Sequence, residues 1–130
     1  MKFPNWLRVY GDTTYRGPCP TETAEQSTFF NQLPADLKRI ALHIRNEGKR
    51  SHAQHAKMKA EGGFVSGASD VIIPGRVTFV CEMKRLDHTK SKWQPGQIDY
   101  LEACQDAGAW VCVALGWEAA MEAVREWQAQ

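Results

Sequence analysis

Two acidic residues and one lysine stand at the ends of two strand-like segments. The stretch from Ser69 to Leu86, SDVIIPGRVTFVCEMKRL, contains two apolar runs joined by a Pro-Gly turn. Asp70 opens the first run, and Glu82 and Lys84 close the second. Side chains two residues apart on a strand point to the same face. Glu82 and Lys84 therefore share a face, and antiparallel pairing of the two runs brings Asp70 beside them.

Two neighbouring carboxylates repel one another unless a cation neutralises them. Mg²⁺ is the usual hard cation for such a pair, and the main-chain carbonyl of Met83 can complete the oxygen ligands. Lys84 could then orient or activate a water, or balance charge on a phosphate. A salt bridge of Lys84 with either carboxylate at a sheet edge explains the same spacing. The spacing alone leaves both interpretations open.

The remaining elements follow from periodicity and capping signals. Thr21 is a candidate N-cap for a helix over 22–33, and Pro34 begins a short second helix. Residues 41–46 suggest a short strand, and 51–63 a helix between Ser51 and Gly62. After the hairpin we expect a helix over 95–108, an apolar strand over 109–115 that is covered on both faces, and a closing helix over 118–128. This order predicts an α/β protein with helices on the faces of its sheet.

The amino-acid composition limits the class of protein to which the chain can belong. The 130 residues are 43% hydrophobic and 24% charged, with a net charge of +1, which suits one globular domain. The four cysteines form no CxxC pair and predict free thiols. We find neither an apolar run long enough to span a membrane nor the apolar core of a signal peptide, so we expect a cytoplasmic protein. Residues 1–19 are expected to be a loop-like leader, and residues 20–130 the domain.

The order and spacing of several segments resemble a known nuclease family. Asp70 followed by Glu82-Met83-Lys84 resembles the D…(E/D)-x-K core of the PD-(D/E)xK superfamily. The context is similar to the virus-type replication–repair nuclease (VRR-NUC) domains: PTETAEQSTFF, NEGKRS, EGGFVSGASDVIIP, FVCEMK, Gln97 and GAWVCVALGWEAAMEAV. The resemblance covers residues 20–124. Ser69 stands where the family often has proline.

The resemblance implies a fold and a set of roles. The fold would be a restriction-endonuclease-like core, a small mixed sheet with a β-hairpin and flanking helices. Asp70 and Glu82, with the Met83 carbonyl, would bind Mg²⁺ or Mn²⁺, and Lys84 would be the catalytic lysine. Gln97 would lie near the metal and the scissile phosphate. Glu22 would be an outer or second metal ligand, with Glu25 in reserve for that role.

The implied activity is hydrolysis of DNA phosphodiester bonds by a metal-dependent endonuclease. Stand-alone phage-type members are homodimers that cut Holliday junctions, so we expect a homodimer, branched DNA as the substrate, and a phage or prophage origin. The aromatic residues of the leader, with Trp117 and Trp127, could supply the dimer contact or pack on their own domain. Flap- or nick-directed cleavage and DNA binding without cleavage are the alternatives. Two basic segments predict DNA contacts at Lys49, Arg50, His52, Lys57, Lys59, Lys90 and Lys92.

Overall fold

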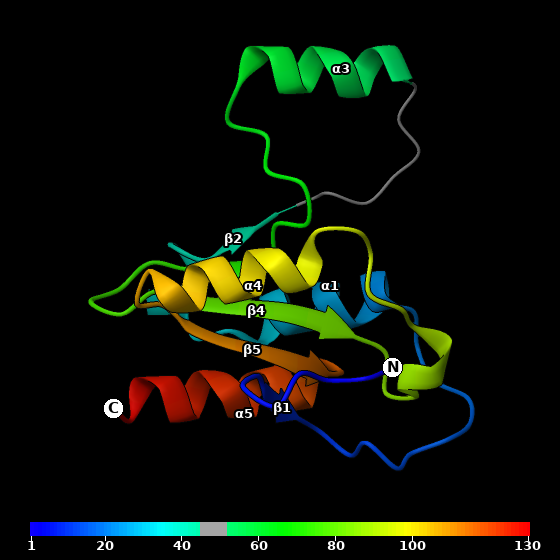
Figure 1. Ribbon diagram of the computed structural model, residues 1–130. Helices are drawn as coiled ribbons and strands as arrows, with labels where there is room; N and C mark the ends of the chain where they lie inside the picture. The colour runs from blue at the N-terminus through cyan, green and yellow to red at the C-terminus, as the bar shows by residue number, and fades with distance from the viewer. Residues whose placement is uncertain (45–51) are drawn as a thin grey trace.

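The protein is built on one five-stranded mixed sheet (Figure 1). The structure, a computed structural model, describes residues 1–44 and 52–130. The strands are β1 (Arg8–Tyr10), β2 (Leu42–His43), β3 (Val71–Ile73), β4 (Phe79–Lys84) and β5 (Trp110–Leu115), in the spatial order β1-β5-β4-β3-β2. β4 and β5 pair in parallel, and β3 pairs antiparallel with β4 as the hairpin predicts. The predicted α/β fold class is confirmed.

Helices cover both faces of the sheet. The helices of the chain are α1 (Glu22–Gln32), α2 (Ala35–Lys38), α3 (His52–Glu61), α4 (Gln97–Asp106) and α5 (Trp117–Gln128), with a short 3-10 turn at His88–Lys90. α1 and α5 contact one face of the central strands, and α4 packs on the other face (Figure 1). Thr21 caps α1 as predicted, because its hydroxyl accepts a hydrogen bond from the Ala24 N–H.

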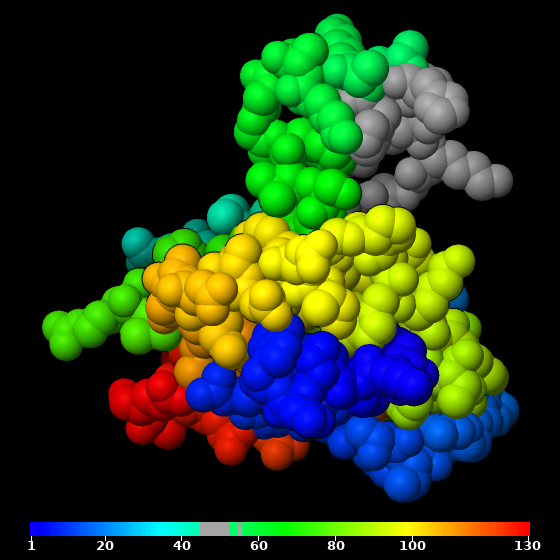
Figure 2. All heavy atoms as spheres, in the orientation of Figure 1, coloured from blue at the N-terminus to red at the C-terminus, as the bar shows by residue number. Residues whose placement is uncertain are grey.

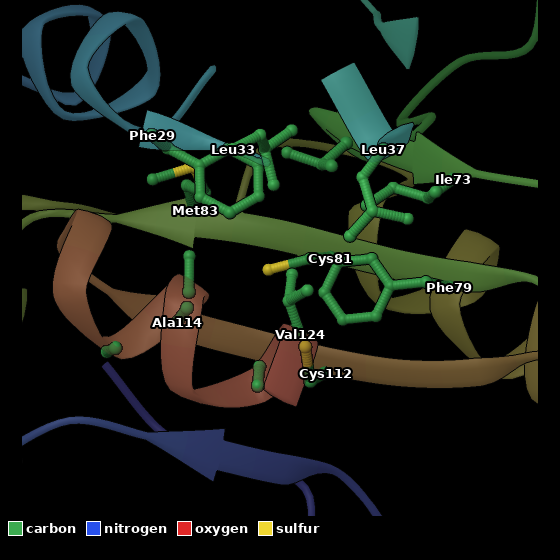
Figure 3. Packing of buried hydrophobic residues seen from close by; sticks show 14 of the residues in the cluster. Phe29, Leu33, Leu37, Ile73, Phe79, Cys81, Met83, Cys112, Ala114 and Val124 are labelled. Carbon is green, nitrogen blue, oxygen red and sulfur yellow. The ribbon is translucent and has the colours of Figure 1, made fainter. Parts of the chain in front are cut away.

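The alternating side chains of β4 divide the core in two. Phe79, Cys81 and Met83 point to the α1 and α5 side, where they join Phe29, Leu33 and other buried residues (Figure 3). Val80 points to the other side and packs with Leu101 of α4 and with the β5 residues Val111 and Val113. Both core clusters are fully or almost fully buried. The strand period of two therefore places Glu82 and Lys84 on the α4 side.

The N-terminal segment differs from the expected loop-like leader. Arg8–Tyr10 forms β1, an edge strand parallel to β5, and Leu7 is buried in the core beneath α4. Three residues are too few to show a strand period, and the pairing partner lies about a hundred residues away in the chain. Phe3 and Trp6 pack against this core as well, and Tyr10 packs against the core on the other face of the sheet. These aromatic residues are therefore used within the chain.

The cysteines and the tryptophans of the last helix lie within the domain. All four cysteines are free thiols, as predicted. Trp117 and Trp127, both on α5, pack against the core of their own domain. Among residues 1–44 and 52–130, no helix is long and apolar enough to cross a membrane.

Candidate active site

The hairpin brings Asp70 and Glu82 together. Val71 pairs with Cys81, and the same register continued by one residue places Asp70 opposite Glu82. Asp70 lies where the ladder ends, and its Oδ2 accepts a hydrogen bond of 2.9 Å from the Met83 N–H. The exposed fractions of the two residues are 8% and 1%. The sequence prediction that these carboxylates meet is confirmed, and they do so where the inner strands β3 and β4 begin and end.

Lys84 is enclosed by polar groups at the same end of the sheet. Its Nζ donates to the main-chain carbonyl of Lys92 at 2.8 Å and to Gln97 Oε1 at 3.0 Å. Glu82 Oε1 lies 3.8 Å from this nitrogen. The Trp93 ring centroid lies 5.5 Å away, within the range of a cation–π contact. The residue is only 1% exposed, so these contacts take the place of water around the ammonium group and hold it in position.

Gln97 links the lysine to the glutamate. It is the first residue of α4, and its Nε2 donates to Glu82 Oε1 at 2.9 Å. Its Oε1 accepts from Lys84 and also from the Gln94 N–H at 2.8 Å. One amide therefore holds two charged side chains in a fixed relation. The structure brings this residue to the place that the family resemblance implies.

Burial makes the two carboxyl groups hard to ionise. Desolvation raises the pKa of Asp70 to about 6, although hydrogen bonds from Glu82 and Met83 and the charge of Lys84 oppose this effect. Burial, and then repulsion from Asp70, raise the pKa of Glu82 well above its usual range. The ammonium of Lys84 favours the charged form of both groups. A single lysine is thus too little positive charge for the pair.

The residues at this end of the sheet fit a hard divalent cation. Glu82 Oε2 is buried and has no hydrogen-bond partner among the residues that the structure describes. Two ionised carboxylates cannot donate to one another, so either a shared proton or a cation is needed between them. The Met83 carbonyl points to the same side of β4 as its N–H, which faces Asp70. Two carboxylates and a carbonyl match the ligands that Mg²⁺ takes alongside water.

Glu22 and Glu25 lie in different environments on α1. Glu22 Oε2 accepts a hydrogen bond of 2.8 Å from Ser91 Oγ, and the Glu22 charge raises the pKa of both Asp70 and Glu82. Glu25 accepts instead from the Trp117 N–H at 2.7 Å and so caps α5. Within the described residues, no group of three or more His, Cys, Asp and Glu side chains is close enough to share a metal ion. Glu22 therefore stands at the edge of the site.

The predicted DNA-contacting residues that the structure describes lie in two separate segments, and Lys92 of the second segment adjoins the site through its main-chain carbonyl. Lys49 and Arg50 lie outside the described residues, and of His52 only the backbone, at the start of α3, is described. Lys57 and Lys59 are exposed on α3, which stands apart from the sheet (Figure 1). The remaining two follow β4: Lys90 donates to the Gly17 carbonyl at 3.0 Å, and Lys92 is exposed.

Two glycines that the sequence reasoning missed hold the site together. Gly67, with φ +79°, precedes Asp70 by three residues, and Gly96, with φ +88°, immediately precedes Gln97. A Cβ on Gly67 would overlap the carbonyl group of Gly96 and lie 2.5 Å from the Gln97 nitrogen. The backbones therefore cross at a distance that only glycine permits. The sequence offered one signal for them: a glycine three residues before Asp70 and another immediately before Gln97.

Fold and site together define a class: an α/β domain with a mixed sheet, a D…ExK hairpin and a glutamine at the start of the next helix. Among solved structures, the chain is similar to one described as a VRR_NUC domain protein, with a TM-score of 0.67 and 20% sequence identity. The match covers 86% of this chain and 89% of that chain. No known protein family profile and no curated protein matches the sequence. The chain therefore has the fold of a VRR_NUC domain, as its sequence predicted.

We expect Gly67→Ala to destabilise the protein far more than Gly63→Ala. Both residues have a positive φ, +79° and +75°, but nothing lies within 4 Å of a Cβ on Gly63. The backbone strain of about 1–2 kcal/mol is common to both changes. Gly67→Ala adds a backbone overlap, for which we expect a total loss above about 3 kcal/mol. Urea unfolding of both variants measures the difference, and equal losses would contradict the close crossing.

Stability should fall with rising pH when metal is absent. The pKa of Asp70 is raised to about 6 in the folded protein, so folding favours its protonated form. The stabilisation is complete below about pH 4 and is lost as pH rises through about 6, by up to about 3 kcal/mol. Urea unfolding in EDTA across this window measures the fall. Asp70→Asn should make the fall smaller but not abolish it, because burial also raises the pKa of Glu82. Asp99→Asn, a change at an exposed residue of α4, should leave the fall intact.

Proposed function

We propose that the chain is a divalent-metal-dependent DNA nuclease that hydrolyses phosphodiester bonds. The observation that carries this proposal is the buried Asp70–Glu82 pair, whose charge exceeds that of its single lysine. Such a pair is costly in a domain that needs only stability. Its setting in a VRR_NUC fold supports the nuclease interpretation over a structural salt bridge. Mg²⁺ or Mn²⁺ would be held by Asp70, Glu82 and the Met83 carbonyl.

Each residue has a separate part in this proposal. A bound cation would supply Lewis-acid charge at the scissile phosphate. Lys84 places a second positive charge at the site and stabilises the negative charge that develops on the phosphate oxygens. Gln97 orients Lys84 and Glu82 through its two hydrogen bonds. Glu22, which Ser91 orients, would act in the outer shell of the metal site.

The preferred DNA structure is the finer part of the proposal. A four-way junction requires two matched cuts, and a two-fold homodimer would fit its symmetry. Phe3, Trp6 and Tyr10 pack partly on their own domain, whereas Tyr15 of the same segment is exposed, so a dimer contact through this segment stays a proposal. A flap- or nick-directed nuclease, which can act as a monomer, therefore stays as the second candidate. A module that binds DNA without cutting it is the third, and the presence of Asp70, Glu82 and Lys84 favours the enzyme over it.

Basic residues outside the metal site would contact the DNA backbone. Lys57 and Lys59 are exposed on α3, and Lys92 is exposed in the segment that encloses Lys84. Lysines in such positions neutralise phosphates without reading bases. The free cysteines suit a reducing compartment, which supports a cytoplasmic location in a bacterial host and is compatible with a phage origin.

Asp70→Asn should abolish cleavage while preserving the fold. The asparagine oxygen can still accept the Met83 N–H, but the residue no longer offers an anionic ligand. The assay incubates the purified chain and labelled four-way junction, flap or linear duplex with Mg²⁺, Mn²⁺ or EDTA. The matched variant Asp99→Asn should cut like the wild type. Cleavage by Asp70→Asn, or cleavage in EDTA, would rule out the proposed metal site.

Lys84→Met should slow cleavage by about 100- to 1000-fold with little change in DNA affinity. Methionine keeps most of the buried volume but removes the ammonium that neutralises charge at the phosphate. Single-turnover rates at saturating enzyme measure the effect on the chemical step. Lys38→Met, an equivalent change at an exposed lysine of α2, serves as the control. A wild-type rate for Lys84→Met would assign the lysine to a structural salt bridge.

A further inference from the structure

A groove of about 300 Å³ lies beside α4 on the side of the sheet that carries Glu82. Its lining is mainly apolar, with a cation and a hydroxyl near the β3–β4 turn, and includes Ile72, Val77, Val80, Tyr100, Arg76 and Thr78. Figure 2 shows this turn projecting past the end of α4. The size and the mixture of apolar walls with a few polar groups are typical of a ligand site.

The groove lies on the same face of the hairpin as the active site. Ile72 follows Asp70 by two residues, Val80 precedes Glu82 by two, and these two apolar residues are register partners. The strand period therefore turns all four side chains to one face. On α4, Tyr100 follows Gln97 by three residues, which places it about one helical turn further along.

This face of the hairpin is less well covered than the other. Val71 and Ile73, which point to the opposite face, are completely buried. Ile72 is half-buried, and its partner on β2, Leu42, is 51% exposed. Val77 at the turn is 40% exposed. Apolar residues thus form an exposed strip that leads away from the two carboxylates.

We propose, on the basis of the nuclease function above, that the groove binds unpaired bases of the DNA strand that is cut. Paired bases hide their faces inside the duplex, whereas unpaired bases present flat apolar surfaces. The Tyr100 ring and the aliphatic walls suit those surfaces, and Arg76 suits a phosphate further along the strand. Thr78 lies four residues from Glu82, about 13 Å at 3.3 Å per residue, which is about four stacked nucleotides.

The groove therefore specifies a substrate class. DNA with a single-stranded segment beside the cut, such as a flap or an open branch, can occupy both the metal site and the groove. A fully paired arm can occupy only the metal site. Tyr100 and Arg76 would cause the preference for DNA with a single-stranded segment. Neither residue takes part in phosphodiester hydrolysis.

Fluorescence anisotropy can test this, with Ca²⁺ in place of Mg²⁺. The probes are a labelled oligothymidylate and a fully paired duplex of equal length. Tyr100→Leu keeps an apolar side chain but removes the ring, and Arg76→Ala removes the charge of an exposed residue in the β3–β4 turn. We expect each change to weaken oligothymidylate binding roughly tenfold and to leave duplex binding within about twofold of the wild type. Arg39→Ala, at an exposed arginine after α2, should change neither.

Three results would contradict the proposal that the groove binds unpaired bases. The first is wild-type binding of both probes by Tyr100→Leu and Arg76→Ala, and the second is an equal loss for both probes. The third is a change from dimer to monomer mass in the variants, which would assign this surface to a second copy of the chain. If the wild-type chain still cuts DNA in these cases, the nuclease proposal is unaffected. A wild-type chain that neither binds nor cuts DNA would overturn both proposals.

Discussion

The site depends on one constraint: two carboxylates and one ammonium are buried together at the end of a sheet. Charges in such a place are costly unless they are paired and hydrogen-bonded. The surrounding chain supplies those bonds from separate segments, through the Met83 N–H, the Lys92 carbonyl and the amide of Gln97. Even so, Glu82 Oε2 has no partner among the described residues, and the pKa of Asp70 is raised to about 6. A divalent cation would neutralise this excess negative charge, so the charge that makes the pair costly to bury is also the charge that would hold the metal.

The geometry of that charge cluster is set by backbone packing and not by the charges themselves. Gly67 crosses Gly96 so closely that no side chain fits between them, which ties the segment before Asp70 to the start of α4. The first residue of α4 is Gln97, so the crossing fixes the amide that joins Lys84 to Glu82. Strands and a helix start are rigid supports for a functional group. The loop after β4 adds the Lys92 carbonyl from the remaining side.

The sequence predicted what depends on local periodicity. The strand period in FVCEMK, with a Pro-Gly turn before it, was enough to place Glu82 and Lys84 on one face and to bring Asp70 close to them. Gln97 has no such signal, and only the family resemblance indicated it. Glu22 and Glu25 are nearly one helical turn apart, so their spacing could not show that one faces Ser91 and the other caps α5. Strand β1 was missed because its pairing with β5 joins the two ends of the chain, and the glycine crossing was missed because it depends on tertiary contact.

The distribution of apolar surface bears on how the domain would meet DNA. Phe3, Trp6 and Tyr10 are packed within the chain, so the N-terminal segment stabilises the far edge of the sheet and leaves few apolar groups free there. Exposed large apolar side chains occur at Tyr15, Ile40, Leu42, Val65 and Val77, and two of these, Leu42 and Val77, adjoin the face that carries the carboxylates. Apolar surface beside a site for an anionic polymer has little use against phosphates, which need cations. It would suit the faces of bases, which only unpaired strands offer, and this supports the proposal that the groove binds single-stranded DNA.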